Sequence, residues 1–387
     1  MQEQSALAWA REELTRQVEI ASFSDEEHEV VDYLTTRASD LGIPSTRQPV
    51  GGSADNLLLG WDPSPQLVLT AHVDTIRPDW PWDGRVRLEG DRLFGLGAQD
   101  DKGCVVAAML AFELAREAGV DLAAMPVGIG LCVDEEVGGK GSIAMATELA
   151  PALVVGLEGT ELDLCLAEAG FVEFRARFRG RAVHGALREE GENALEQAVA
   201  FATDLQTAAF ARHTHRTCGR NIPMIWELHG GQRLNVVPER AEVHVDIRVT
   251  PGGPTAEQVL ADVRSLGASY DAEIDVVEIS EPFETPADAP LASAMRGAIA
   301  TVRGGQPPAS YGMLAWTDAH NFVDLAGSET VVFGPGHLRN AHRPDESVAL
   351  HDVVECANVL ANLLAHTDEL VAHAARRRDT SPADRAS

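Results

Sequence analysis

The chain has 387 residues, of which 45% are hydrophobic, and its formal net charge at pH 7 is −29. A chain of this length is too long for one small core, so we expect two domains. The excess of negative charge argues against a nucleic-acid partner, which requires a basic face, and against binding to an anionic membrane surface. The sequence has no run of about 18 apolar residues, so we expect no transmembrane helix.

The first part of the chain, residues 1–169, predicts a largely parallel sheet with helices around it. Helical periodicity covers 6–20, 25–41 and 102–118, and the first of these helices is amphipathic and lacks the features of a signal peptide. Strands are predicted at 56–60, 66–74, 125–133 and 152–158, with a short hairpin at 84–97. Because nearly continuous apolar strands alternate with helices, we expect an α/β fold with the sheet buried on both faces.

The pattern changes at residue 170. The segment 170–180 alternates between apolar and polar residues, which predicts a strand with one face in water. Further strands are predicted at 222–231, 239–249 and 272–279, and helices at 192–210 and 255–266. The order β-α-β-β-α-β is that of a ferredoxin-like unit, and we expect it as an insert spanning 170–288.

The apolar pattern of the first part returns at residue 289. A helix at 291–302, a strand at 329–334 and a helix from about 350 to 375 complete the first domain, which therefore includes 289–375. The polar segment 376–387 is predicted to be a disordered tail. Five scattered cysteines without a CxxC pair predict buried free thiols in a cytoplasmic protein: Cys104, Cys132, Cys165, Cys218 and Cys356.

His72 and Asp74 form a His-x-Asp pair at the end of the strand predicted at 66–74. Alternate side chains of a strand point in the same direction, so the carboxylate lies beside the imidazole. A carboxylate in this position fixes the tautomer of a metal-binding histidine. Taken alone, the pair fits a surface His-Asp contact in a loop somewhat better than a metal site.

Asp100 and Asp101 stand just before the helix predicted at 102–118. Aspartate is a preferred capping residue, so one of the two has a structural explanation. The second needs another reason, and the alternatives of helix cap and metal ligand stay open at this point.

Glu135 and Glu136 are adjacent where a buried strand ends, and Glu158 ends the next strand. Open α/β sheets place their ligand sites at the carboxyl ends of strands. Two neighbouring carboxylates at the rim of a core repel each other and are costly to desolvate. Unless the loop is simply solvated, the pair requires a positive partner.

Histidines also follow the last predicted strand, since His337 and His342 stand in the loop after 329–334. One late histidine with His72, Asp100, Glu136 and Glu158 gives two imidazoles and three carboxylates without cysteine, which suits a pair of Zn²⁺ or similar divalent ions. One carboxylate can bridge two such ions, and a further carboxylate is needed to take a proton from the water that attacks the substrate.

Seven stretches, in order, resemble the motifs of the M20 metallopeptidase family: HVDT, LFGLGAQDDKG, DEEVGG, LEGT, RAVHGA, LNVVPERAEVHVDIR and GPGHLRNAHRPDE. The resemblance covers about residues 6–375. It implies a zinc aminopeptidase-like catalytic domain, built from 1–169 and 289–375, and identifies the insert as a lid and dimerisation domain.

The resemblance also implies roles for the residues near the sheet. His72 would bind one metal ion and Asp74 would orient it, with Glu158 as a second ligand of the same ion. Asp100 would bridge the two ions, with a cis peptide bond to Asp101. Glu135 would be the general base, and the other ion would be bound by Glu136 and His342. His342 is preferred to His337 because the family's late ligand lies in an AH pair that is followed by DE.

In the insert, the resemblance implies that His184 reaches the site of a partner subunit and stabilises the oxyanion there. Asn235 and Arg248 match positions that hold the substrate's carboxylate or acyl oxygen, and the planar guanidinium of arginine suits a carboxylate. The chain departs from the family pattern at Val183, before His184, and at Gly159, after Glu158, and neither change removes a reacting group.

The implied activity is hydrolysis of the amide bond of an N-acyl-L-amino acid, as in acetylornithine deacetylase, by a water on two metal ions. A carboxypeptidase or dipeptidase on the same scaffold is the alternative, and a binding module without catalysis is a third reading. Zn²⁺, Co²⁺ and Mn²⁺ all suit the ligands. The expected partners are a small N-acyl amino acid or short peptide and a second copy of the chain.

Overall fold

The structure is a computed structural model that describes residues 1–52, 54–231, 233–368 and 370–372. Contacts within the chain divide it into two compact units, each of which is described by itself. The first unit comprises Met1–Leu166, Thr285–Tyr311 and the chain from Thr317 onward, and the second comprises Ala167–Glu284 and Gly312–Trp316. The predicted tail, 376–387, lies outside the described residues.

The centre of the first unit is a run of parallel strands. β3 pairs with β6 on one side and β7 on the other, and β17 pairs with β7. Their bounds are Leu67–His72 (β3), Val127–Cys132 (β6), Leu153–Gly156 (β7) and Glu329–Val332 (β17). Antiparallel strands flank this centre: β1 (Ser45–Gln48) and β2 (Asn56–Leu59) beyond β6, and β8 (Leu164–Glu168) beyond β17.

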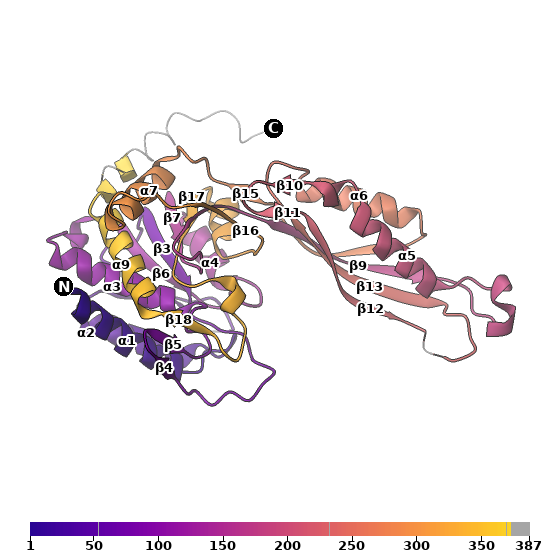
Figure 1. Cartoon of the computed structure of the whole chain (residues 1–387), viewed down its shortest axis with the longest axis horizontal. Coiled ribbons are helices and arrows are strands. Elements are labelled where there is room, and N and C mark those ends of the chain that lie inside the picture. The colour runs from indigo at the N-terminus through magenta and orange to yellow at the C-terminus, as the bar shows by residue number, and fades with distance from the viewer. Residues whose placement is uncertain (53, 232, 369, 373–387) are drawn as a thin grey trace. The chain divides into compact units, whose positions relative to one another are not determined.

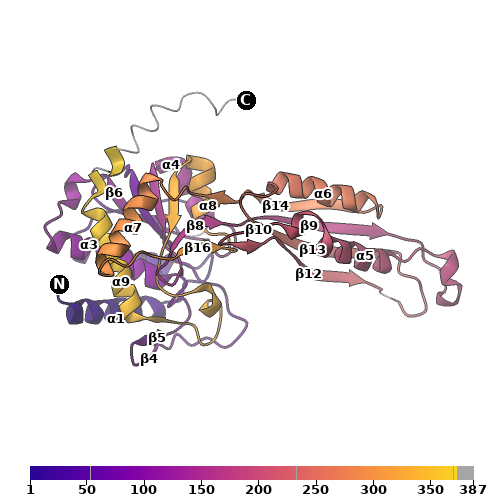
Figure 2. The ribbon, with the colours of Figure 1, turned by 45° about the horizontal axis from the view of Figure 1, so that its top comes forward.

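Helices cover both faces of these strands, as Figures 1 and 2 show. The larger core lies under α1 (Glu3–Glu19), α2 (His28–Asp40), α3 (Lys102–Glu117), α7 (Pro290–Val302) and α9 (Leu350–Leu364). The other face carries α4 (Lys140–Leu149), α8 (Ala319–Asn321) and a π-helical turn at Phe322–Ala326. All residues of β3, β6 and β7 are buried, which confirms the prediction of a mostly parallel sheet enclosed by helices.

A small sheet joins distant parts of the first unit. The predicted hairpin is β4 (Arg87–Glu89) and β5 (Arg92–Phe94), and β18 (Ser347–Ala349) pairs with β5. This pairing brings the chain around residue 346 next to the chain around residue 95.

The second unit has the predicted ferredoxin-like topology. Its chain order is β9 (Gly170–Arg179), α5 (Ala194–Thr207), β12 (Ile222–Gly230), β13 (Arg240–Val249), α6 (Ala256–Ala268) and β14 (Glu273–Ser280). The four strands pair antiparallel in the order β12-β13-β9-β14, with α5 and α6 on one face (Figure 1). Helix α6 begins at a capping box in which Thr255 and Gln258 bond reciprocally to each other's backbone amides.

Short elements complete the chain. They are the 3-10 turns Leu122–Ala124, Gly185–Glu190, Phe210–Arg212 and Leu338–Asn340, and the strands β10 (Thr214–His215), β11 (Gly219–Arg220), β15 (Phe283–Glu284) and β16 (Ser310–Met313). The sequence patterns did not predict β8, β15 or β16, since each is only two to five residues long.

The unit boundaries lie near the predicted divisions after residues 169 and 288, and one further segment differs. Gly312–Trp316 belongs to the second unit although it follows the insert in sequence. Two bonds hold it there: Ala169 N–H donates to the Met313 carbonyl at 2.9 Å, and the Trp316 indole donates to Ser280 Oγ at 3.1 Å.

All five cysteines are buried and free, as predicted. None of the helices in the described part of the chain has the length and apolar character that a membrane crossing requires.

Candidate metal centre

The acidic and histidine side chains singled out in the first unit follow the carboxyl ends of its parallel strands. His72 ends β3, Glu135 and Glu136 follow β6, and Glu158 follows β7. His342 stands in the loop after β17. Since parallel strands end at the same edge of a sheet, the fold brings these residues together.

The His72 imidazole is buried and has acidic neighbours on both ring nitrogens. Its Nδ1 lies 3.2 Å from Asp74 Oδ1, and its Nε2 lies 3.0 Å from Asp100 Oδ1 and 3.8 Å from Glu158 Oε1. With Nδ1 held by Asp74, Nε2 is the nitrogen directed at the other carboxylates, as a metal-binding histidine requires.

Asp100 joins two sets of ligand atoms. Its Oδ1 faces His72, whereas its Oδ2 lies 3.3 Å from His342 Nε2, which is also 2.9 Å from Glu136 Oε1. One oxygen of the carboxylate therefore faces each histidine, and this is the arrangement that a carboxylate bridging two ions needs.

Two groups of three ligand atoms have all members within 4.8 Å of one another. One consists of His72, Asp101 and Glu158, and the other of His72, Asp100 and Glu136. The grouping adds Asp101 to the residues expected as ligands. Nitrogen and oxygen donors without a thiolate suit Zn²⁺, Co²⁺ or Mn²⁺.

The charges at this edge of the sheet fit divalent cations. In the described part of the chain, the only ion-pair partners of Asp100, Glu136 and Glu158 are the two histidines. Asp101 Oδ1 is buried as well. So many carboxylates in a buried space require a positive charge that the lysines and arginines among the described residues do not supply, and divalent metal ions fit this need.

Burial and the neighbouring charges raise the pKa values of two of these carboxyl groups. Burial raises the pKa of the Glu158 carboxyl well above its ordinary value, and the charges of Asp101 and Asp100 raise it further. Burial also raises the pKa of Glu136, although the hydrogen bond from His342 opposes the shift. Both carboxylates therefore gain from a neighbouring cation.

The pKa values of the two histidines are also raised, and in their case the neighbouring carboxylates are the cause. Burial acts to lower the pKa of His72, but hydrogen bonds to Asp100 and Asp74 outweigh it and hold the pKa well above its usual value. Hydrogen bonds to Asp100 and Glu136 raise the pKa of His342 to about 10. Burial acts to raise the pKa of Asp100, yet its bonds to His342 and His72 bring it below the ordinary value.

Glu135 belongs to neither group of ligand atoms. Burial raises the pKa of its carboxyl well above the ordinary value, His72 opposes the shift, and the charges of Asp318 and Glu136 add to it. A carboxylate beside a metal site, outside the ligand set and with a raised pKa, has the properties of a general base.

Asp74 binds the backbone of the turn after β6 as well as the imidazole of His72. Its Oδ1 and Oδ2 accept hydrogen bonds from the backbone amides of Glu135 and Glu136, each at 3.1 Å. The preceding amide, that of Asp134, donates to Glu27 Oε1 at 3.2 Å. Three consecutive amides are thus fixed by two buried carboxylates.

Glu27 was missed by sequence reasoning. It stands at the start of α2 but makes no capping bond to that helix, and its carboxylate accepts from the amides of Asp25 and Asp134 instead. An acidic residue at a helix start is so common that only the folded structure connects it with a residue 107 positions later.

The sequence left open whether Asp100 and Asp101 cap a helix or bind metal, and the hydrogen bonds of Asp101 do not support a capping role. Asp101 is at the N-cap of α3, but its side chain caps no helical amide. Its Oδ2 accepts from the backbone amide of His72 at 3.2 Å. The peptide bond between Asp100 and Asp101 is cis, as the family resemblance implied.

The three residues expected to contact substrate from the insert lie in the second unit, at two places. His184 and Asn235 are exposed neighbours, since Gly185 N–H donates to the Asn235 carbonyl at 2.7 Å. Arg248 lies near the other end of β13, where its Nε donates to Asp246 Oδ1 at 3.0 Å and its guanidinium lies over the Phe171 ring.

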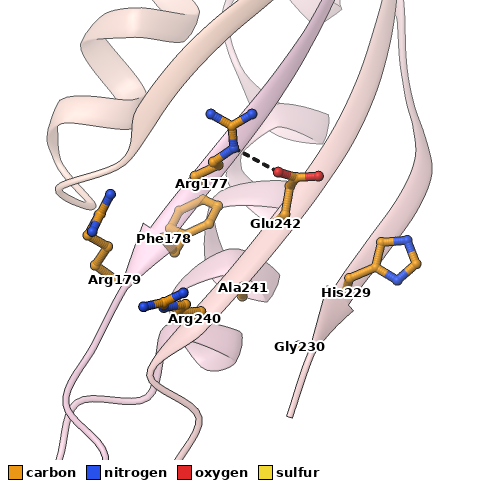
Figure 3. A pocket seen from close by; sticks show the side chains of 8 residues that line it. All are labelled: Arg177, Phe178, Arg179, His229, Gly230, Arg240, Ala241 and Glu242. Atoms are coloured by element: carbon orange, nitrogen blue, oxygen red, sulfur yellow. Dashed lines mark hydrogen bonds and ion pairs between the residues drawn. The ribbon is translucent and has the colours of Figure 1, made fainter. Parts of the chain in front are cut away.

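A hollow of about 380 Å³ on the sheet of the second unit contains none of the predicted site residues. Figure 3 shows its lining, including Arg177, Arg240 and His229. Arg177 is already paired with Glu242, at 2.8 Å. The hollow therefore offers no chemistry comparable to the acidic edge of the first unit.

Comparisons with known proteins agree with this geometry. Residues 68–366 match the model of peptidase family M20/M25/M40. The chain is 30% identical over 365 residues to an acetylornithine deacetylase of Myxococcus xanthus, covering 87% of this chain and 91% of that protein.

Solved structures resemble the whole fold. The aminopeptidase PepT of Bacillus cereus superposes with a TM-score of 0.76 at 19% identity, covering 95% of this chain and 99% of that one. An M20 family metallo-carboxypeptidase of Sulfolobus solfataricus does so with a TM-score of 0.72 at 17% identity, covering 94% and 99%.

Proposed function

The chain belongs to peptidase family M20/M25/M40 and is a metal-dependent hydrolase, and from this premise we propose that it cleaves the amide bond of an N-acyl-L-amino acid. The observation that carries the choice of substrate class is the likeness to an acetylornithine deacetylase, which extends over 87% of this chain. The acyl group is proposed to be small, as in an N-acetyl amino acid.

The centre is proposed to hold two divalent ions, most simply Zn²⁺, with Co²⁺ or Mn²⁺ as alternatives. His72 and Glu158 would hold one ion and Glu136 and His342 the other. Asp100 would bridge them, and its two oxygens facing the two histidines support this assignment. When bound, such ions polarise a carbonyl group and lower the pKa of water.

Glu135 is proposed to move the proton. Its carboxylate would take a proton from the attacking water and deliver it to the nitrogen of the leaving amine, which completes cleavage of the amide. Asp74 would keep His72 in the required tautomer and fix the backbone of Glu135 through its amide bond.

The insert, residues 170–288, is proposed to act as a lid and dimerisation domain. Arg248 would bind the carboxylate of the substrate, and His184 and Asn235 would act on the substrate held by a partner subunit. The length of β13 supports this division, because Arg248 is eight steps along the strand from Arg240, a distance of about 25 Å. His184 and Asn235, at the far end, are too distant from Arg248 to share one small substrate within a chain.

A substrate panel tests the proposal. N-acetyl, N-succinyl and aminoacyl derivatives of several amino acids would be incubated with the enzyme loaded with Zn²⁺, Co²⁺ or Mn²⁺, and the released amine measured. Faster cleavage of the N-acetyl amino acids supports the proposal, and preference for dipeptides contradicts it.

A carboxypeptidase or dipeptidase activity is the second candidate. It is favoured by the likeness of the whole fold to a solved metallo-carboxypeptidase, and it would use the same residues. The same panel separates the two, since a peptidase requires an aminoacyl or peptidyl group as the acyl part. Absence of metal-dependent amine release from every substrate would indicate a binding module instead.

A further inference from the structure

His342 has an unusual position for a metal-binding residue. Its side chain is 47% exposed, whereas that of Asp100, the acid it faces, is 7% exposed. A half-exposed imidazole receives little help from packing, so its position depends on how the backbone of its loop is fixed. We call residues 334–346, between β17 and β18, the histidine loop.

The end of the histidine loop is fixed by Glu346, which is buried. Its Oε1 accepts from the backbone amides of Gln99, at 3.0 Å, and Asp100, at 3.2 Å. Its own carbonyl accepts from the Gly95 amide at 3.0 Å. Glu346 therefore joins the loop to the segment that carries Asp100, four residues after His342.

The beginning of the loop is fixed by Gln99, whose side chain is also fully buried. Its Oε1 accepts from the backbone amide of His337 at 3.1 Å. The side chain fills the space beside two glycines, because an added Cβ would lie 2.2 Å from Gln99 Cγ at Gly336 and 3.0 Å from Gln99 Nε2 at Gly159. Gln99 precedes Asp100 in the chain and packs against Gly159, the residue after Glu158, and against Gly336 of the histidine loop.

We propose that Gln99 and Glu346 are positioning residues that fix both ends of the histidine loop and thereby set the affinity of the ion that His342 binds. The inference rests on the proposed two-ion centre. Neither side chain is a ligand in it, and both act on His342 and Asp100 through the backbone. Loss of either anchor releases His342 from Asp100 and Glu136 but leaves His72 and Glu158 in place.

The test is a titration of metal-free protein with Zn²⁺, with bound metal counted by mass spectrometry and the Co²⁺ spectrum recorded for each site. Glu346→Ala and Gln99→Leu are expected to keep the ion of His72 and Glu158 and to bind the ion of His342 about 10- to 100-fold more weakly. His342→Ala should show the same pattern, and Glu346→Gln, which keeps the accepting oxygen, should stay near the wild type.

Ser328→Ala is the matched control. It removes one buried bond, from Ser328 Oγ to the Pro151 carbonyl at 2.7 Å, at the opposite end of β17 from the histidine loop. The control and the anchor variants should lower the melting temperature of metal-free protein similarly, and only the anchor variants should weaken the second ion.

The inference and the proposed function fail differently. If the wild type binds two ions and both anchor variants bind them equally well, the positioning role is overturned and the proposed centre stands. If the wild type binds fewer than two ions, the two-ion centre is overturned and this inference with it. Should Glu346→Ala not fold, Gln99→Leu decides the question alone.

Discussion

Glu135 and Glu136 are neighbours in the chain with different surroundings. Glu136 Oε1 lies 2.9 Å from His342 Nε2 and is part of a ligand group, whereas Glu135 is not. Because adjacent residues at the end of a strand point in different directions, one carboxylate can face a cation while the other faces the substrate. The repulsion between them is offset by the cations.

Replacing each glutamate by glutamine separates the two roles. We expect Glu135→Gln to retain both ions and to lose about 10²- to 10⁴-fold in kcat, because the amide cannot accept the proton. Glu136→Gln should lose metal, and excess metal should restore part of its activity. Metal analysis and steady-state kinetics on the same preparations check this, and near-normal turnover of Glu135→Gln would falsify its assignment as the base.

The histidines predict how metal binding depends on pH. The pKa of His342 is raised to about 10 and that of His72 is raised as well, so protons compete with metal ions for both imidazoles. Binding an ion must release these protons, so raising the pH strengthens binding, by about tenfold per pH unit for each proton released.

Calorimetric titration with Zn²⁺ in two buffers of different ionisation enthalpy counts the released protons. His342→Ala should release at least one proton fewer than the wild type. An affinity that does not change between about pH 6 and 8 would show that the histidines are not ligands.

The proposed metal ligands could be predicted from the sequence because each of them stands next to a recognisable pattern of secondary structure. His72, Asp100, Glu136 and Glu158 each follow a pattern that predicts the end of a strand or the start of a helix. Glu27 has no such context, and although Gln99 and Glu346 lie within quoted motifs, nothing in those motifs indicates which groups their side chains bind. They act by accepting bonds from backbone amides of distant segments, and a side chain that binds backbone leaves no pattern in the sequence of its partner.

At the scale of elements, the turn between β6 and α4 carries the proposed base, and side chains from other segments bind its backbone. Its amides donate to Asp74 and Glu27, and Asp134 adopts a positive φ of 67°. A non-glycine residue in the left-handed region needs surrounding bonds to keep it there. Asp74 and Glu27 therefore add to the bonds that the turn makes within itself and with Lys140.

Glu27→Ala tests this bracing from outside the proposed ligand set. Removing the buried acceptor leaves the Asp134 amide unsatisfied, which costs about 1–3 kcal/mol of unfolding free energy. We expect kcat to fall while metal content stays at the wild-type level, because Glu135 loses its position and the ligands do not. Glu27→Gln, which keeps one accepting oxygen, should recover most of kcat, and equal losses in both variants would contradict the bracing role.

Whole elements were predictable to different degrees for a physical reason. In long apolar strands such as β3 and β6 and in the capped helix α6, the hydrophobic pattern and the residue propensities indicate the same element. The structure has these elements close to the predicted bounds. The short strands β8, β15 and β16 form through pairing with distant residues, which local patterns do not encode. For the same reason, the placement of Gly312–Trp316 with the second unit was not predicted.

In the whole molecule, the two units have separate hydrophobic cores, and the acidic centre lies in the first unit alone. Removing metal should therefore destabilise one unit selectively, because the buried carboxylates repel one another without cations. We expect chelation to lower the melting temperature of one calorimetric transition by several degrees and to leave the other in place. An equal shift of both transitions would contradict this, and re-addition of Zn²⁺ should restore the first.

The separation of His184 from Arg248 along β13 makes a prediction about two copies of the chain. If His184 acts on the substrate of a partner subunit, Glu135→Gln and His184→Ala each have little activity alone but complement each other when mixed. In a mixed dimer, the site with an intact Glu135 receives its histidine from the other chain, so random exchange of subunits should restore about a quarter of wild-type activity. The measurement is amine release after the inactive variants are co-refolded, with each variant refolded alone as the control. If the mixture stays inactive although mass analysis shows mixed dimers, His184 serves its own chain or has no role in the reaction.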